Sequence, residues 1–118
     1  MGDSRDLGQR GEDAAVAHLS GLGMVVVARN WRCRYGEIDV VAREGPTLVF
    51  CEVKTRSGLG YGSPLAAITA AKQARLRRLA ALFLVEVGGH RGPVRIDAVG
   101  VLWPGEGSPD VVHLRGVA

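Results

Sequence analysis

GEIDVVAREGPTLVFCEVKTR, Gly36 to Arg56, is the stretch from which the fold of this 118-residue chain can be inferred. It predicts two strands joined by a turn at Gly45-Pro46, because apolar and β-branched residues dominate both halves. Side chains of a strand alternate between the two faces of its sheet. Paired as a hairpin, the strands therefore bring Asp39 on one arm beside Glu52 and Lys54 on the other.

These three charged side chains suggest a metal site. Neighbouring carboxylates repel each other, and removing either one from water is costly. A divalent cation between Asp39 and Glu52 would make the arrangement favourable, because carboxylate oxygens suit Mg²⁺ or Mn²⁺. Lys54 points into the same space, where it can orient an attacking water or neutralise a phosphate. Metal, water and ammonium around one scissile group are the components of phosphodiester hydrolysis.

Each half of this pattern also has a plainer interpretation. An isolated Glu-x-Lys pair on a strand is usually a solvated surface, and Gly-Glu-Ile-Asp alone is equally unspecific. Asp39 on one arm of an apolar hairpin, with Glu52 and Lys54 on the adjacent arm, favours a site over this alternative.

The sequence predicts one helix before the hairpin and one after it. The first begins near Asp6, where Asp6 and Gln9 resemble a capping box, and ends at Gly21 and Gly23. The second begins at Ser63-Pro64 and runs to about Val87, because Ser caps helices and Pro tolerates their first position. Further strands are predicted over residues 24–32 and 94–103, with a short last strand within residues 110–116.

This order, α-β-β-β-α-β with room for the last strand, predicts a single α/β domain over residues 1–118. Helices are expected to flank a mixed central sheet. The ends, about 1–5 and 105–118, need not be regular.

Composition narrows the classes of function. The net charge of +3 and the pI of about 9.3 are compatible with a polyanionic partner but do not identify one. Cys33 and Cys51 lack any zinc-binding spacing, which indicates reduced thiols in a cytoplasmic protein. No stretch reaches the length of a membrane span or of a secretory signal, so no membrane partner is expected.

Basic residues surround the acidic hairpin in the sequence. Arg29, Arg32, Arg34 and Arg56 bracket it, and arginines there can hold a phosphate backbone around an acidic centre. The alternative is a scattered basic surface. Tyr61, in a glycine-rich loop, can stack on a base or cover the core.

Lys72 interrupts the apolar stripe predicted for the second helix. A lysine in that place either snorkels to the edge of the core or faces an anion, and we favour the anion. Arg75 lies closest to the face of Lys72. The stripe consists of Leu65, Ile68, Leu76, Leu79 and Phe83.

Asp39 and the run Glu52-Val53-Lys54 resemble the D…(D/E)-x-K signature of the PD-(D/E)xK nuclease superfamily. The chain, except its ends, resembles the YraN family of small bacterial proteins, which is related to Holliday-junction resolvases. Ile38 rather than proline precedes Asp39, a departure of little weight because that proline binds no metal. The stretches that carry the resemblance are GEDAAVAHL, ARNWRCRYGEIDVVA, LVFCEVKTR, AAKQARL and RIDAVGV.

The resemblance implies a restriction-endonuclease-like fold and a Mg²⁺- or Mn²⁺-dependent endonuclease that hydrolyses phosphodiester bonds of branched or damaged DNA. It implies that Asp39 and Glu52 bind the metal and that Lys54 is the catalytic lysine. Glu12 matches the helix carboxylate that completes the metal site. Without the resemblance, Glu12 is equally well an exposed acid near the start of its helix.

The family also places a basic residue near the metal site, at the position of Lys72. Its resolvase-like relatives act as symmetric dimers, so a homodimer is a hypothesis here. Glu37 is expected to support the metal ligands without binding the metal.

Four other polar or aromatic residues have plainer expectations. His18, Trp31 and Trp103 are expected in the core. Asp97 lies on a predicted strand and has no partner that the sequence identifies.

Two other classes of function stay open. The chain can be a nucleic-acid-binding module that keeps the nuclease fold without catalysis, or an interaction protein whose acidic cluster is structural. Without metal, Glu12, Asp39 and Glu52 would repel phosphates. The presence of all three favours catalysis over binding alone.

Overall fold

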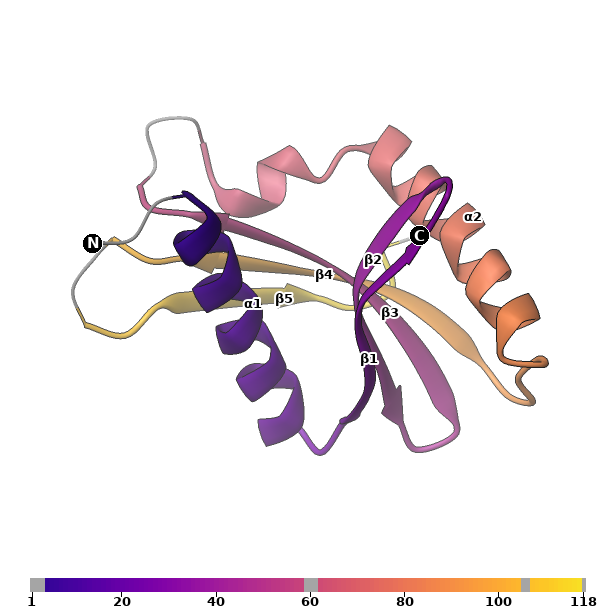
Figure 1. The fold of residues 1–118 in the computed structure, drawn as a ribbon. Helices are drawn as coiled ribbons and strands as arrows, with labels where there is room; N and C mark the ends of the chain where they lie inside the picture. Colours follow the sequence, from indigo (N-terminus) through magenta and orange to yellow (C-terminus); the bar gives the residue numbers. More distant parts are fainter. Residues whose placement is uncertain (1–3, 59–61, 105–106, 118) are drawn as a thin grey trace.

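A computed structural model describes residues 4–58, 62–104 and 107–117, with side chains from Leu7 onward. The predicted order of helices and strands is confirmed, including the short last strand (Figure 1). The elements are α1 (Ser4–Gly21), β1 (Val25–Cys33), β2 (Gly36–Glu44), β3 (Thr47–Arg56), the 3₁₀ helix η1 (Pro64–Ala67), α2 (Ala70–Glu86), β4 (Val94–Leu102) and β5 (Asp110–Leu114).

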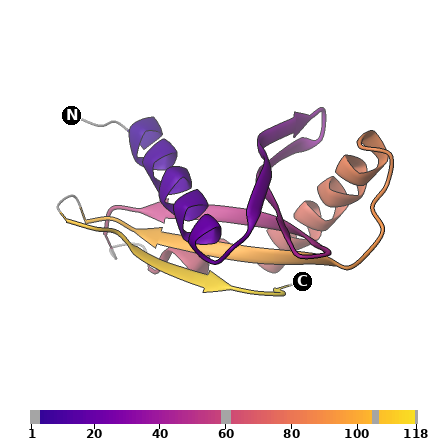
Figure 2. The same ribbon diagram turned by 90° about the horizontal axis from the view of Figure 1, so that it is seen from below.

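The five strands form one mixed sheet in the order β1-β2-β3-β4-β5. Strands β3 and β4 are parallel, whereas the other three pairs are antiparallel. The β1–β2 hairpin rises from the layer of β3, β4 and β5 and lies between α1 and α2 (Figure 2). The predicted α/β class is therefore confirmed, and the architecture is consistent with a restriction-endonuclease-like fold.

The alternation of β3 divides the core into two clusters, one on each face of the sheet. Val49 and Cys51 pack with Ala15 and Leu19 of α1. Leu48 and Phe50 point the other way and pack with Leu76, Leu79 and Phe83 of α2. The central strand is thus buried on both faces, which explains its nearly continuous apolar run.

The second predicted helix is divided, so its predicted start at Ser63-Pro64 is wrong for α2. Ser63 makes no side-chain cap, and Pro64 begins only the short η1. Extended Thr69 then caps α2, because its hydroxyl accepts a hydrogen bond from the Lys72 amide (3.2 Å). Leu65 and Ile68 consequently lie outside the apolar stripe of α2.

Helix α1 begins at Ser4, two residues before the predicted cap at Asp6. The helical spacing of Leu7, Gly11, Ala14, Ala15, His18 and Leu22 predicts its buried stripe. Gly11 and Ala15 are buried as this spacing predicts, whereas Leu19 takes the place expected for His18 and Leu22. No described helix is long and apolar enough to cross a membrane.

Candidate active site at the fork between two strands

Asp39 lies where β2 separates from β3. The antiparallel pairing of these strands runs from Glu44–Thr47 to Val40–Cys51 and stops there. The Val53 amide donates a hydrogen bond to Asp39 Oδ2 (2.8 Å) instead of to a backbone carbonyl. The separation of the strands therefore places a carboxylate in the opening between them.

The backbone is distorted at the same level. Asn30 has a left-handed φ of 52° and lies between the pairs Arg29–Val40 and Trp31–Ile38. Asparagine tolerates this conformation better than most residues do. Ile38 belongs to the core under α2, whereas Val40 belongs to the core under α1. Strand β2 thus twists at Asp39.

The Asp39 carboxyl holds its proton unusually strongly. Burial raises its pKa, the hydrogen bond from the Val53 amide lowers it in part, and the charges of Glu52, Glu12 and Glu37 raise it further, to about 7. Three other carboxylates from α1, β2 and β3 therefore act on Asp39. Their convergence on Asp39 was predicted for Glu12 and Glu52, and the structure brings both within electrostatic reach.

Glu52 faces a polar pocket between the sheet and α2. Burial raises its pKa, the charges of Lys72, Arg75 and Lys54 lower it, and Glu37 raises it; the net direction is upward. The pocket is lined by Glu37, Asp39, Glu52, Lys72, Arg75, Leu76 and Leu79. We call it the acidic pocket.

Lys72 lines this acidic pocket and lies one turn before Leu76, at the N-terminal end of the apolar stripe of α2. Lys72 is exposed and belongs to the first turn of α2. Because α2 begins at Ala70, Lys72 precedes the apolar stripe rather than interrupting it, and the role predicted for Lys72 stays a prediction.

Lys54 lies two residues after Glu52 on β3, and its charge stabilises the ionised form of Glu52. It is half-buried and does not belong to the described lining of the acidic pocket. Lys54 therefore acts on Glu52 from outside the described lining of the pocket.

Glu12 reaches the cluster from α1. Its side chain is 20% exposed, and Arg29 Nη2 lies 3.8 Å from Oε1. This oxygen is buried without a hydrogen-bond partner among the described residues. A buried carboxylate oxygen in this state still needs a donor or a cation.

The carboxylates of this cluster are chemically suited to a hard cation, but they do not converge on one point as metal ligands do. Asp39, Glu52 and Glu12 offer the oxygen atoms that Mg²⁺ and Mn²⁺ prefer. Within the described ranges, however, no three Asp, Glu, His or Cys side chains converge as a ready metal site. Metal binding would require side-chain rotation toward a common point.

The remaining predicted phosphate-binding residues have different partners. Arg75 lines the acidic pocket, whereas Arg32 pairs with Glu37 (2.9 Å), which is itself a lining residue. The Arg34 guanidinium carbon lies 5.3 Å from the centroid of the Tyr35 ring. Arg56 Nε is buried without a partner among the described atoms.

A second buried polar cluster was missed in the sequence. Asp97 is fully buried on β4 and accepts hydrogen bonds from Arg95, from the Gly116 amide (3.0 Å) and from His113 (2.7 Å). His113 Nδ1 lies 3.1 Å from Nε2 of His18 on α1. An acid inside the apolar strand RIDAVGV was the available signal, because a buried charge requires partners.

The aromatic expectations hold in part. Trp31 and Trp103 are only partly buried and pack against the edges of the two core clusters. His18 is partly buried within the polar cluster rather than among apolar side chains. Tyr61 lies outside the described residues.

Comparisons with known proteins all identify one family. The family described as "Uncharacterised protein family UPF0102" matches residues 11–101, which include Glu12, Asp39, Glu52, Lys54 and Lys72. A UPF0102 protein of Clavibacter michiganensis is 56% identical over 115 residues, 98% of each chain. One from Streptomyces griseus is 56% identical and covers 95% of each chain. One from Mycolicibacterium smegmatis is 49% identical over 95% of this chain and 92% of its own. The chain therefore belongs to the UPF0102 family, the YraN family that its sequence resembles.

Proposed function

We propose that this protein is a metal-dependent endonuclease that hydrolyses phosphodiester bonds of DNA, as Holliday-junction resolvases do. One observation carries the proposal: a half-buried carboxylate, Asp39, occupies the opening between β2 and β3, with Glu12 and Glu52 close enough to act on it. Three acids in partial burial are unfavourable without a cation. Lys54, two residues after Glu52, would supply the ammonium group that phosphodiester hydrolysis also requires.

Each residue has a role in this proposal. Asp39 and Glu52, with Glu12, would hold Mg²⁺ or Mn²⁺, which activates water and offsets charge on a phosphate. Lys54 would orient the attacking water beside these acids. Lys72 and Arg75 would bind the phosphate backbone at the mouth of the acidic pocket, and Glu37 would keep Arg32 in place.

The test is an endonuclease assay on linear, supercoiled and four-way-junction DNA with Mg²⁺ or Mn²⁺. We expect cleavage by the wild type and a loss of at least about 100-fold in Lys54→Ala, the range expected for a group that moves or positions a proton. Arg77→Ala, an exposed position on α2, is the matched control. Metal-dependent cleavage that persists in Lys54→Ala would exclude this role for Lys54.

The lack of a ready three-donor cluster among the described residues favours one alternative, a nucleic-acid-binding module without catalysis. Calorimetric titration of the wild type and Asp39→Asn with Mn²⁺ separates the two functions. The nuclease requires binding that Asp39→Asn weakens, whereas the binding module requires none. A homodimer, proposed by analogy with resolvases, is measured by sedimentation of the same samples.

A further inference from the structure

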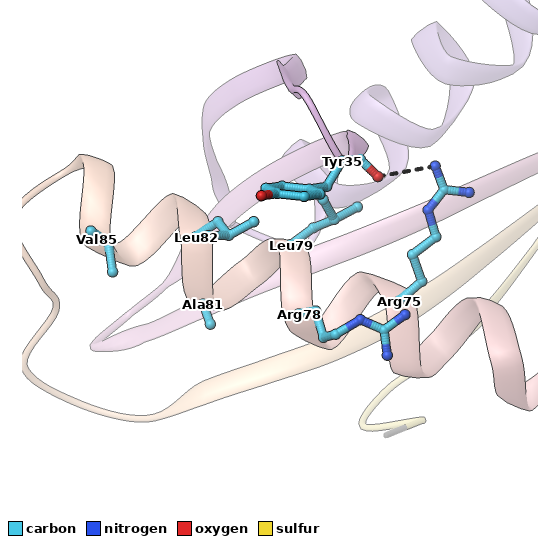
Figure 3. Close-up of a pocket in the computed structure, with 7 residues that line it drawn as sticks. All are labelled: Tyr35, Arg75, Arg78, Leu79, Ala81, Leu82 and Val85. Carbon is cyan, nitrogen blue, oxygen red and sulfur yellow. Dashed lines mark hydrogen bonds between the residues drawn. The ribbon is translucent and has the colours of Figure 1, made fainter.

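A second groove lies next to the acidic pocket, between the β1–β2 turn and α2 (Figure 3). Its apolar walls are Tyr35 from the turn and Leu79, Leu82 and Val85 from α2. Tyr35 is 61% exposed and Val85 is 79% exposed. An aromatic ring and aliphatic side chains left in water side by side indicate a binding surface. We call this surface the Tyr35 groove.

One end of the Tyr35 groove is strongly basic. Arg75 and Arg78 line it, and Arg75 Nη2 donates a hydrogen bond to the Tyr35 carbonyl (3.3 Å). Figure 3 shows both side chains at the same end of the groove, away from Val85. The groove thus offers an apolar slot and two guanidinium groups, a combination that suits a ligand with a flat apolar part and an anionic part.

The Tyr35 groove is continuous with the acidic pocket. Arg75 and Leu79 line both of them. Tyr35 precedes Asp39 by four positions, which corresponds to at most about 13 Å of extended chain. A chain molecule that places a phosphate near Asp39 can therefore reach the groove with a neighbouring unit.

The local backbone holds the Tyr35 ring at this place. Gly36 has a φ of 141°, and a Cβ there would meet the Arg75 guanidinium. The Arg34 guanidinium lies over the ring. Glycine at position 36 thus permits the close approach of the turn to α2.

We propose that the Tyr35 groove binds an unpaired nucleobase of the DNA strand that passes the acidic pocket. The base would stack on Tyr35 and contact Leu82 and Val85, while Arg75 and Arg78 bind its flanking phosphates. Paired bases inside a duplex have both faces covered, so the substrate class is DNA with single-stranded or splayed nucleotides. This inference rests on the proposed function.

Charge complementarity selects this occupant over a protein. A second copy of this chain or an apolar peptide would also cover Tyr35 and Val85. An apolar partner would gain nothing from two cationic groups beside a polar pocket. An anionic strand uses both the apolar slot and the arginines.

Binding in EDTA, where no cleavage occurs, tests the inference. The probes are a fluorescein-labelled duplex and the same duplex with a single-stranded tail that contains 2-aminopurine. We expect Tyr35→Ala to weaken binding of the tailed DNA about tenfold and to leave duplex binding unchanged, because one base loses its stacking partner. Tyr35→Phe keeps the ring and should keep wild-type affinity.

Two further readouts identify the contacts. The 2-aminopurine fluorescence should be quenched by the wild type and by Tyr35→Phe, but not by Tyr35→Ala. Arg78→Gln should lower the slope of log affinity against log salt by about 1 for the tailed DNA, since one phosphate contact is lost. Equal effects of Tyr35→Ala on both DNAs, or no effect on either, would overturn the inference.

The outcomes separate this inference from the proposed function. If Tyr35→Ala cuts all substrates as the wild type does, the inference is wrong and the nuclease stands. If the wild type neither binds nor cuts any DNA, both are wrong. If Leu82→Asp turns a dimer into a monomer and leaves the affinity for tailed DNA unchanged, the groove is an interface between copies and the inference is also wrong.

Discussion

Asp39 serves two opposed requirements. Its carboxylate accepts a hydrogen bond from the Val53 amide across the opening between β2 and β3, yet partial burial among three other acids disfavours its ionised form. A folded-state pKa of about 7, against 3.8 in the free side chain, means that the folded chain binds a proton more tightly than the unfolded chain. The contribution of Asp39 to stability therefore falls as the pH rises from about 4 to about 7.

Asp39→Asn is expected to stabilise the protein in EDTA above pH 7. The amide oxygen can still accept the Val53 hydrogen bond. The cost of holding an ionised Asp39 in the folded state, about 4 kcal/mol, disappears. Urea unfolding at pH 5 and pH 8 measures this, and the advantage of the variant should grow with pH. Added Mn²⁺ should stabilise only the wild type. A lower stability of Asp39→Asn than of the wild type at pH 8 without metal would contradict this account of the site.

The placement of Glu12 depends on how closely α1 approaches β3. Gly11 is buried against Thr55, and a Cβ at position 11 would overlap the Thr55 side chain. The absence of a side chain thus lets the helix come near enough for the next residue, Glu12, to act on Asp39.

Gly11→Ala is expected to destabilise the protein by about 1–3 kcal/mol, because the added methyl group forces α1 away from the sheet. It should also reduce cleavage, since Glu12 moves with the helix. Gly8→Ala, one turn earlier in α1 with no atom near its Cβ, is the control and should be neutral or stabilising. Thermal unfolding with parallel cleavage rates makes the comparison. Equal melting temperatures for the two variants would show that the contact between Gly11 and Thr55 does not limit how closely α1 packs on the sheet.

The cluster around Asp97 connects most of the molecule. His18 belongs to α1, Arg95 and Asp97 to β4, and His113 to β5. Arg95 and Arg115 both donate to Glu44 of β2. Burial raises the pKa of Asp97, but hydrogen bonds from Arg95, His113 and the Gly116 amide outweigh it and hold the pKa below its ordinary value.

Asp97→Asn is expected to lower the free energy of unfolding by about 3–5 kcal/mol at pH 7, because it leaves buried partners uncompensated. Asp97 has a depressed pKa, so its contribution is present above pH 3.8 and is lost as the pH falls through its folded-state pKa. The gap between wild type and variant should therefore shrink in strong acid. Exposed Asp110→Asn is the control in urea titrations at both pH values. If Asp97→Asn lowers the free energy of unfolding no more than Asp110→Asn does, Asp97 does not stabilise the fold.

Protonation of His18 lowers the stability of the folded chain, as protonation of Asp97 does. Burial and the charges of His113 and Arg115 lower its pKa, so the unfolded chain binds the proton more readily below pH 6.5. Stability is then lost as the pH falls from 6.5. In acid, protonation of His18 and of Asp97 both lower the stability, whereas protonation of Asp39 raises it.

Local patterns in the sequence determined the order of helices and strands and the neighbouring positions of Asp39 and Glu52. Alternation along Gly36–Glu44 and Thr47–Arg56 placed Asp39 and Glu52 together, because hairpin pairing depends on neighbouring residues. The tertiary structure alone decided the break before Thr69, the bond from Val53 to Asp39 and the link from Asp97 to His113. It also decided how Tyr35 meets α2. The contacts of Asp97 with His113 and of Tyr35 with α2 join residues far apart in the sequence, and no local periodicity records how those elements pack.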